Sequence, residues 1–214
     1  MLALIPARQG SKRFPGKNKA SFLGKGLLEI TYECASTCPD IEGIAMSSDD
    51  DELIARAVKL GIEVPFKRSA ILSSDHANTW EVVLDFLHRT GFEGYVCVLQ
   101  LTSPLRSAED ISETLRLAKA NKNAPALSVR ETLDGEHSKS WLCPCSQTIS
   151  SSKHCESALN VVPNGGVYIL HSSQLSLSAF AALEGCAAHL VPLDRSLDID
   201  FESQLQAAEK EVWP

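Results

Sequence analysis

The sequence predicts an α/β fold with a doubly wound, mostly parallel sheet. Short apolar runs alternate with amphipathic runs of helical length along the first half of the chain. The amphipathic runs carry helix start and stop signals, namely acidic first turns, a Ser-x-x-Asp pattern and terminal glycines. Strands that alternate with helices of this length favour a parallel sheet that is covered on both faces.

The first elements follow in regular order. Residues 2–7 (LALIPA) are a short apolar run typical of a buried strand, and 27–36 repeat apolar side chains at helical spacing. The run 43–48 predicts the second strand. Residues 49–61 predict a helix, because acidic residues open the segment and a glycine ends it. The apolar stretch 62–66 is interpreted as a short strand or a sheet edge.

The next elements continue the alternation. Residues 78–91 are amphipathic and end at a glycine, so they predict a helix. Residues 95–101 form a nearly continuous apolar strand, and 107–121 open with a Ser-x-x-Asp capping signature. The remaining elements are strands at 126–129, 166–170 and 187–193 and a final helix from about Glu202.

The alternation fails over residues 130–164, which mix polar residues with a Cys-Pro-Cys motif and the low-complexity stretch SQTISSSKH. This segment is too long for a simple connection in a compact domain. We therefore expect a single domain, 1–214, with an insertion at about 130–164 that packs elsewhere, with a second subunit as one candidate.

Composition restricts the class of protein. The chain has 214 residues, of which 44% are hydrophobic and 22% charged, which is typical of a globular protein with a substantial core. A net charge of −7 argues against general nucleic-acid binding. The first apolar run is too short for a signal peptide, and no later run could span a bilayer, so we expect a cytoplasmic protein with no membrane partner.

The seven cysteines are scattered, and a cytoplasmic setting predicts that most are reduced. Cys143-Pro-Cys145 followed by His154-Cys155 admits a zinc site, but the spacing fits no standard zinc motif. Free thiols are the favoured interpretation, which metal analysis would test.

The basic segment after the first strand is the strongest local signal. It holds six of the 20 Lys and Arg residues, and no acidic residue precedes Glu29. A solvated basic face is the simpler alternative, but the glycines and prolines within the segment disfavour a helix. The glycine spacing fits neither a dinucleotide fingerprint nor a Walker A loop. Because the segment follows a parallel strand, it predicts a phosphate loop of another type, suited to a triphosphate.

Two further clusters lie near predicted ligand-binding edges. Asp198 and Asp200 lie two residues apart, so on an extended segment both carboxylates face one side and could share a Mg²⁺ ion. A polar loop with a helix N-cap is the alternative. Gln100 and Thr102 lie at the end of the strand 95–101, and Arg106 lies just before the next helix cap; a polar strand-to-helix connection is an equally acceptable interpretation.

Five motifs, in this order, resemble the acylneuraminate cytidylyltransferases (CMP-sialic acid synthetases), a family that includes the pseudaminic and legionaminic acid cytidylyltransferases. They are IPARQGSKRFPGKN, SSDDDELIARAVKLGIEVPFKR, LQLTSPLRSAEDI, PNGGVYI and LDIDFESQLQAAE. The resemblance runs from Ile5 to about Glu209 and is weakest over 132–162. It implies Mg²⁺-dependent coupling of CTP to a nonulosonic acid, which gives a CMP-sugar and pyrophosphate.

The resemblance also implies roles for individual residues and a homodimer in which the inserted segment reaches over the partner's active site. Catalytic roles fall to Arg8, Lys17 and Asp200, and metal binding to Asp198 and Asp200. The implied substrate contacts are Arg8, Ser11, Lys17, Asn18, Arg68 and Thr79 for the nucleotide, and Gln100 and Lys139 for the sugar acid.

One departure concerns the sugar. Relatives that use N-acetylneuraminic acid often carry an arginine just before PNG, whereas this chain has Val162, which cannot pair with a carboxylate. This predicts either another basic residue, such as Lys153 or His154, or a different sugar such as pseudaminic or legionaminic acid. Two rival functions stay open: transfer of another nucleotide to a sugar phosphate, and nucleotide binding without turnover.

Overall fold

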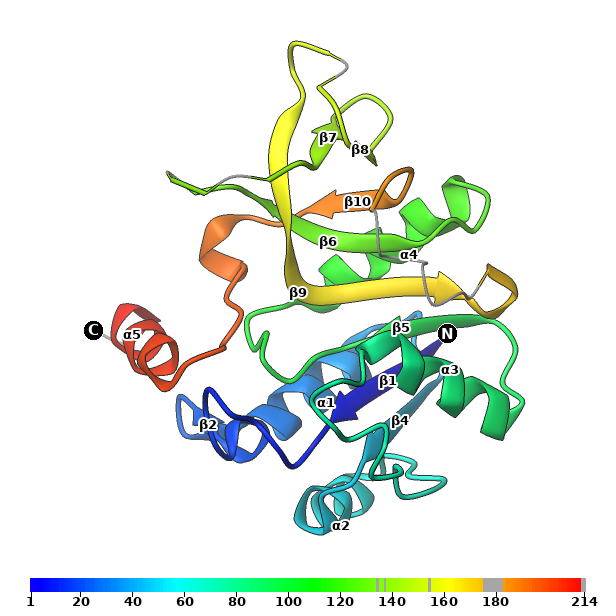
Figure 1. Cartoon of the computed structure of the whole chain (residues 1–214), viewed down its shortest axis with the longest axis vertical. Coiled ribbons are helices and arrows are strands. Elements are labelled where there is room, and N and C mark those ends of the chain that lie inside the picture. The colour runs from blue at the N-terminus through cyan, green and yellow to red at the C-terminus, as the bar shows by residue number, and fades with distance from the viewer. Residues whose placement is uncertain (134, 137, 154, 175–182, 213–214) are drawn as a thin grey trace.

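The structure is a computed structural model of the whole chain, and it describes residues 1–133, 135–136, 138–153, 155–174 and 183–212 (Figure 1). Within these ranges, eight strands form one sheet in the order β4-β1-β5-β9-β6-β10-β8-β7, and β2 and β3 form a separate ribbon. The sheet strands are β1 (Leu2–Ala7), β4 (Gly43–Ser48), β5 (Tyr95–Val98), β6 (Ala126–Glu131), β7 (Trp141–Cys143), β8 (Thr148–Ser150), β9 (Leu159–His171) and β10 (Ala187–Leu190), and the ribbon strands are β2 (Ser21–Phe22) and β3 (Lys25–Gly26).

The helices connect and cover these strands. They are α1 (Leu27–Thr37), α2 (Asp51–Leu60), α3 (Thr79–Thr90), α4 (Ala108–Ala120) and α5 (Glu202–Val212), with 3₁₀ turns at Lys17–Lys19, Ser172–Gln174 and Leu193–Arg195. The predicted helix signals are confirmed: Ser107 and Asp110 form a capping box at α4, and Gly61 and Gly91 end α2 and α3. None of the helices in the described ranges is long and apolar enough to cross a bilayer.

The sheet is mixed. β1 pairs in parallel with β4 and β5, and β6 pairs in parallel with β10. β9 lies between these groups and runs antiparallel to both of its neighbours. The prediction of a mostly parallel sheet therefore holds for each group but not for the sheet as a whole. An antiparallel strand needs no crossover helix, so β9 can enter the centre of the sheet directly after the β7–β8 hairpin.

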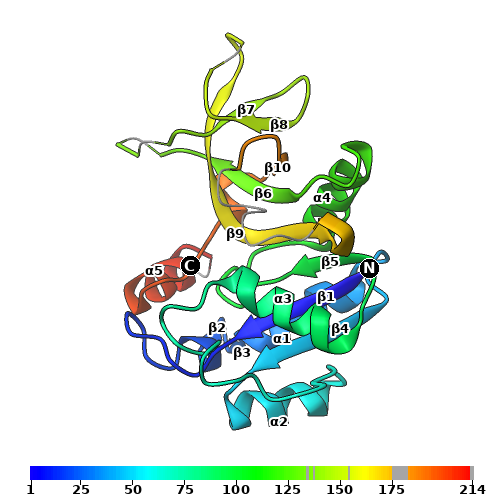
Figure 2. The same cartoon turned by 45° about the vertical axis from the view of Figure 1, so that its right-hand side comes forward.

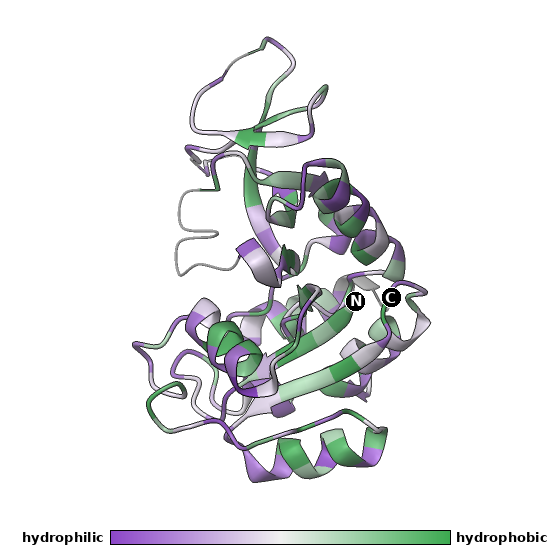
Figure 3. Cartoon of the chain, turned by 90° about the vertical axis from the view of Figure 1, so that its right-hand side faces the viewer, coloured by the Kyte–Doolittle hydropathy of each residue, from purple (hydrophilic) through white to green (hydrophobic). Residues whose placement is uncertain are grey.

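The sheet has an apolar core on each face. Alternate residues of β1 divide between them: Ala3 and Ile5 pack with α1, α2, α4 and α5, whereas Leu4 packs with α3 on the opposite face. Figure 2 shows α3 in front of β1 and α1 behind it. Figure 3 colours the central strands largely hydrophobic, as burial on both faces requires. The α/β prediction is confirmed.

Four segments differ from the sequence-based expectation. Residues 62–66 contribute only an isolated bridge, Ala45 to Glu63, rather than a strand. The strand expected at 166–170 is the end of the long β9, and the one expected at 187–193 stops at Leu190. The inserted segment 130–164 contains β7, β8 and the first half of β9, and it extends this chain's own sheet rather than packing only elsewhere.

Candidate functional site

A cavity of about 680 Å³ opens at the edge of the sheet where β1, β4 and β5 all end. Because these strands are parallel, their carboxyl-terminal loops meet at this edge, as the sequence predicts. Eight of the ten predicted site residues line the cavity: Arg8, Lys17, Asn18, Arg68, Thr79, Gln100, Asp198 and Asp200.

The basic loop after β1 is held by carboxylates from distant parts of the chain. Arg8 and Lys12 both bind the Asp75 carboxylate, with N–O distances of 3.0 and 2.6 Å. Arg13 and Lys17 bind Asp200 Oδ1 at 3.0 and 3.1 Å. The loop therefore presents cations that two carboxylates neutralise, an arrangement in which an incoming polyanion could replace those carboxylates.

The loop also has its own adjoining cavity. Ser11, Lys12 and Asp75 line a space of about 330 Å³ beside the main cavity, so the ninth predicted residue lies there. Asn18 fixes the loop by donating from Nδ2 to the Arg8 carbonyl at 2.9 Å. The geometry suits a chain of phosphates that extends from the main cavity into the smaller one.

Arg68 is a buried cation with an unused donor. Its side chain donates to the Ser47 carbonyl at 2.9 Å, and burial lowers the pKa of its guanidinium. Arg68 Nε has no hydrogen-bond partner among the described residues, although it is buried. Since a buried donor without an acceptor is costly, a ligand acceptor at this position would stabilise the site.

Thr79 lies at the other side of the cavity, in the first turn of α3. Asn78 caps this helix, and the Asn78–Glu81 capping box fixes its start, so Thr79 is held at the cavity wall. Trp80 follows, and its ring meets Tyr168 of β9 edge to face with centroids 5.5 Å apart. The two aromatic rings form an apolar wall of the cavity.

Asp198 and Asp200 reach the same cavity from the segment before α5. Burial, and then the charge of Asp200, raise the pKa of the Asp198 carboxyl, although a hydrogen bond to Thr102 opposes the shift. A cation bound beside the Asp198 carboxyl would favour its ionised form, which burial and the neighbouring charge disfavour. Among the described residues, no group of three or more His, Cys, Asp or Glu side chains forms a complete metal cage.

The PNG motif needs its glycine, Gly165, because this residue lies directly against Asp198. It adopts φ +75°, and a Cβ placed there would lie 2.9 Å from Asp198 Oδ2 and 3.1 Å from Ser103 Oγ. The Asp198 carboxylate therefore occupies space that only glycine leaves open.

Gly165→Ala is expected to lower the free energy of unfolding by about 1 kcal/mol from backbone strain and by at least about 1 kcal/mol more from this clash. Chemical denaturation measures the sum of the two losses, and comparison with a second glycine separates them. Gly185→Ala is the matched control, because Gly185 also has φ +75° but no atom within 4 Å of the added Cβ. Equal losses in the two variants would show that the Asp198 contact has no effect on stability.

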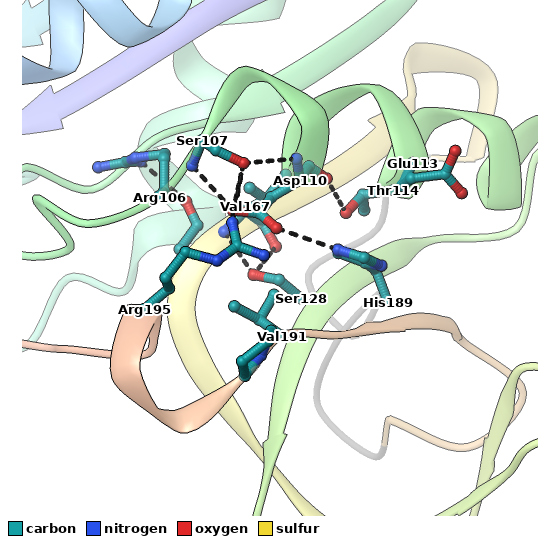
Figure 4. Close-up of polar contacts among 12 residues, drawn as sticks. Arg106, Ser107, Asp110, Glu113, Thr114, Ser128, Val167, His189, Val191 and Arg195 are labelled. Carbon is teal, nitrogen blue, oxygen red and sulfur yellow. Dashed lines mark hydrogen bonds and ion pairs between the residues drawn. The ribbon is translucent and has the colours of Figure 1, made fainter.

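The loop that carries Asp198 is fixed by a polar network on α4. Arg195 donates to Asp110 Oδ2 at 2.7 Å and to Ser107 Oγ at 2.9 Å, while His189 contacts Asp110 Oδ1 at 3.1 Å (Figure 4). Burial alone would raise the pKa of Asp110, but its contacts with His189 and Ser107 outweigh burial and lower it to about 2. The network anchors the turn three residues before Asp198.

The family model described as "Cytidylyltransferase" matches residues 2–158, more than half of the chain. The chain belongs to the cytidylyltransferase family.

Several curated cytidylyltransferases are similar to the chain. The chain is 37% identical over 116 residues to pseudaminic acid cytidylyltransferase of Campylobacter jejuni, covering 52% of this chain and 50% of that protein. It is 37% identical over 123 residues to CMP-N,N'-diacetyllegionaminic acid synthase of Legionella pneumophila, covering 56% and 53%. N-acylneuraminate cytidylyltransferase of Escherichia coli is 26% identical over 221 residues, covering 97% and 51%. The chain spans about half the length of these relatives.

The fold is shared more widely. A solved structure of CMP:2-keto-3-deoxy-manno-octonic acid synthetase, complexed with CTP, superposes with a TM-score of 0.74 at 17% identity and covers 99% of this chain and 97% of its own. 4-Diphosphocytidyl-2C-methyl-D-erythritol synthase of Anaerococcus prevotii superposes with a TM-score of 0.62 at 12% identity, covering 100% and 98%. Both extend the match in fold beyond residue 158.

Two positions that the sequence indicates for sugar recognition, Lys139 and Val162, do not line the cavity of this cytidylyltransferase. Lys139 is exposed on the inserted segment, so its sugar contact stays a prediction. Val162 pairs with Arg130 across β9 and β6, and the next residue, Pro163, lines the cavity instead. The expected substitute Lys153 lies over the Trp141 ring, and His154 falls outside the described residues.

The sequence interpretation missed four contributors: Asp75, Trp80, Tyr168 and Gly165. Tyr168 is part of the PNGGVYI motif, but its packing on Trp80 joins residues 88 positions apart in the chain. Asp75 lies in a polar loop. The one sequence signal for it is that the basic segment contains no acidic residue, so its cations need carboxylate partners from elsewhere in the chain.

Proposed function

We propose that this chain transfers CMP from CTP to the anomeric hydroxyl of a nonulosonic acid, giving a CMP-sugar and pyrophosphate. One observation carries the proposal: the basic loop, the buried Arg68 and the two aspartates line one cavity at the carboxyl edge of the sheet. The names of the three relatives described above support both the nucleotide and the class of sugar.

The donor set fits Mg²⁺. Asp198 and Asp200 supply oxygen ligands only, and Mg²⁺ usually takes one or two carboxylates together with water and substrate phosphates. Burial, and to a smaller degree the charge of Asp200, raise the pKa of Asp198, and a bound cation would oppose both effects. A bound Mg²⁺ ion would supply charge neutralisation at the α-phosphate.

The side chains divide the remaining work. Arg8 and Lys17 would neutralise the β- and γ-phosphates, and so the departing pyrophosphate, once Asp75 and Asp200 release them. The anomeric oxygen forms a bond to the α-phosphorus while the bond from that phosphorus to the bridging oxygen of pyrophosphate breaks in line. Asp200 would accept the hydroxyl proton, and Arg68 Nε would donate to the cytosine.

The cavity also constrains the sugar. Trp80, Tyr168, Val82 and Leu183 give one wall an apolar character, which suits acyl and deoxy groups rather than a fully hydroxylated sugar. Gln100 lies on the same lining and would hydrogen-bond the sugar acid. These features favour an acylated nonulosonic acid, such as the diacetyllegionaminic acid that the name of one relative contains.

The deciding experiment measures pyrophosphate release from CTP and Mg²⁺ with pseudaminic, legionaminic and N-acetylneuraminic acids, with products identified by mass. Turnover with one of the first two acids is expected. A clear preference for N-acetylneuraminic acid would overturn the sugar assignment. Release with UTP or GTP and a sugar phosphate, or CTP binding without any turnover, would establish one of the two rival functions.

A homodimer in the cytoplasm completes the proposal. Exposure of Lys139 on the inserted segment is compatible with a residue that reaches a partner's cavity. Sedimentation of the purified chain tests the dimer, and a strictly monomeric active enzyme would reject it.

Asp75→Asn is expected to lower the apparent KM for CTP roughly two- to tenfold, because Asp75 occupies Arg8 and Lys12 in the ligand-free chain. Steady-state kinetics measures the effect. Asp51→Asn is the control, since Asp51 forms a comparable ion pair with Lys67 that does not involve the cavity lining. A raised KM in Asp75→Asn would show instead that this carboxylate helps to bind the nucleotide.

A further inference from the structure

Three of the seven cysteines converge away from the cavity, at the β7–β8 hairpin. Cys143 ends β7, Cys145 lies in the hairpin turn, and Cys155 precedes β9. Cys143 Sγ lies 2.8 Å from Cys145 Sγ and 3.6 Å from Cys155 Sγ. All three are free thiols, and none of them lines the cavity.

The thiols differ in their proton affinity. Hydrogen bonds from the Cys145 thiol and from Ser146 lower the pKa of Cys143 to about 6, whereas the pKa of Cys145 is raised by the same contact. Cys143 is therefore the more acidic of the two thiols and carries more of the thiolate at neutral pH. Burial has the opposite effect elsewhere, raising the pKa of Cys186 to about 11 and that of Cys34 as well.

Solvent exposure also distinguishes the three cysteines at the β7–β8 hairpin from most of the others. Cys145 is exposed, and Cys143 and Cys155 are partly exposed, while Cys38, Cys97 and Cys186 are buried. A solvent-accessible thiolate next to a second thiol is the arrangement of redox-reactive cysteines, whereas a buried neutral thiol is inert.

We propose that Cys143 and Cys145 are a redox-active dithiol that a hydroperoxide oxidises to an intramolecular disulfide. The Cys143 thiolate attacks the peroxide oxygen, so that the O–O bond breaks, water or an alcohol leaves, and Cys143 becomes a sulfenic acid. The Cys145 thiol then attacks that sulfur and displaces a second water, and the two electrons of the pair have reduced the peroxide. Closure to about 2.0 Å requires the two sulfurs to approach by less than 1 Å.

The geometry favours this chemistry over zinc. Tetrahedral Zn–S bonds of about 2.3 Å separate two sulfurs by about 3.8 Å, well beyond the 2.8 Å between Cys143 and Cys145. Among the described residues, no set of three or more metal-binding side chains is arranged around one centre.

Cys155 is a second possible disulfide partner for Cys143, and the experiment makes use of it. The fully reduced chain is treated with stoichiometric hydrogen peroxide at pH 7, remaining thiols are alkylated, and tryptic peptides are weighed. Cys143 and Cys145 share the tryptic peptide 140–153. After oxidation this peptide is expected to carry no alkyl group and to be 2 Da lighter than the same peptide in its reduced, unalkylated form. Cys145→Ser is expected to move the disulfide to Cys143–Cys155, because that sulfur is next nearest.

Cys143→Ser is expected to slow thiol loss at least about tenfold, since the thiolate is removed. Cys34→Ser is the matched control and keeps the wild-type rate. Wild-type oxidation in Cys143→Ser, or no oxidation of the unaltered chain, would overturn the proposal. Stoichiometric zinc in the purified protein, with thiols that alkylate only after chelation, would overturn it in favour of a metal site. These readouts do not depend on CTP or turnover, so the result is separate from that for the proposed function.

Discussion

Asp198→Asn is expected to lower kcat about a hundredfold or more while leaving the free energy of unfolding unchanged or slightly higher. The loss of activity follows from the removal of one of the two carboxylates that would bind the cation at the α-phosphate. The stability follows from the folded chain itself, in which burial and the charge of Asp200 already oppose ionisation of Asp198. Asparagine has nearly the same shape and keeps an acceptor for Thr102.

This combination separates a functional carboxylate from a structural one. A structural aspartate would lose both activity and stability when it is neutralised, whereas a carboxylate held for chemistry loses activity alone. Pyrophosphate release and chemical denaturation on the same preparation measure both quantities. Asp194→Asn, an exposed aspartate in the same segment, is the control and should change neither. Near-normal turnover in Asp198→Asn would remove the assigned role of the D-x-D pair.

The parts of the site that the sequence predicts are those encoded locally. Parallel strands send their carboxyl-terminal loops to one edge, so the loop with Lys17 and the loop with Gln100 could be placed together before any contact was known. The capping box at Ser107 is visible in the sequence for the same reason, because it needs only residues three apart.

The parts that the sequence does not predict depend on pairing across long distances. β9 is antiparallel and central, yet its apolar pattern gives no indication of direction or neighbours. The contact of Gly165 with Asp198 joins two motifs 33 positions apart, and the Asp75 partnership with Arg8 joins residues 67 apart. Such contacts are decided by tertiary packing, which local periodicity does not encode.

Substitution of Arg106 is expected to change the free energy of unfolding more than any other substitution considered. Its guanidinium is buried and donates to the carbonyls of Gly166 at 2.8 Å, Ser103 at 3.0 Å and Gln100. These bonds join the turn after β5 to β9, which bends where its register against β6 shifts (Figure 1), so Arg106 holds the Gln100 loop against the strand that carries the glycines. Burial lowers the pKa of Arg106, so the folded chain keeps this charge at a cost, which the hydrogen bonds to the carbonyls offset.

Arg106→Met is therefore expected to lower the free energy of unfolding by at least about 3 kcal/mol, because hydrogen bonds to a charged group contribute about 1.5–3 kcal/mol each and buried carbonyls lose their donor. Chemical denaturation measures the change. Arg106→Lys should recover only part of it, since an ammonium group cannot reproduce the planar fork that reaches several carbonyls. Arg116→Met, which removes an exposed arginine paired with Glu113, should cost less than about 1 kcal/mol. Equal stability of Arg106→Met and Arg116→Met would mean that the bend of β9 is fixed by its own strand pairing and that Arg106 adds nothing to it.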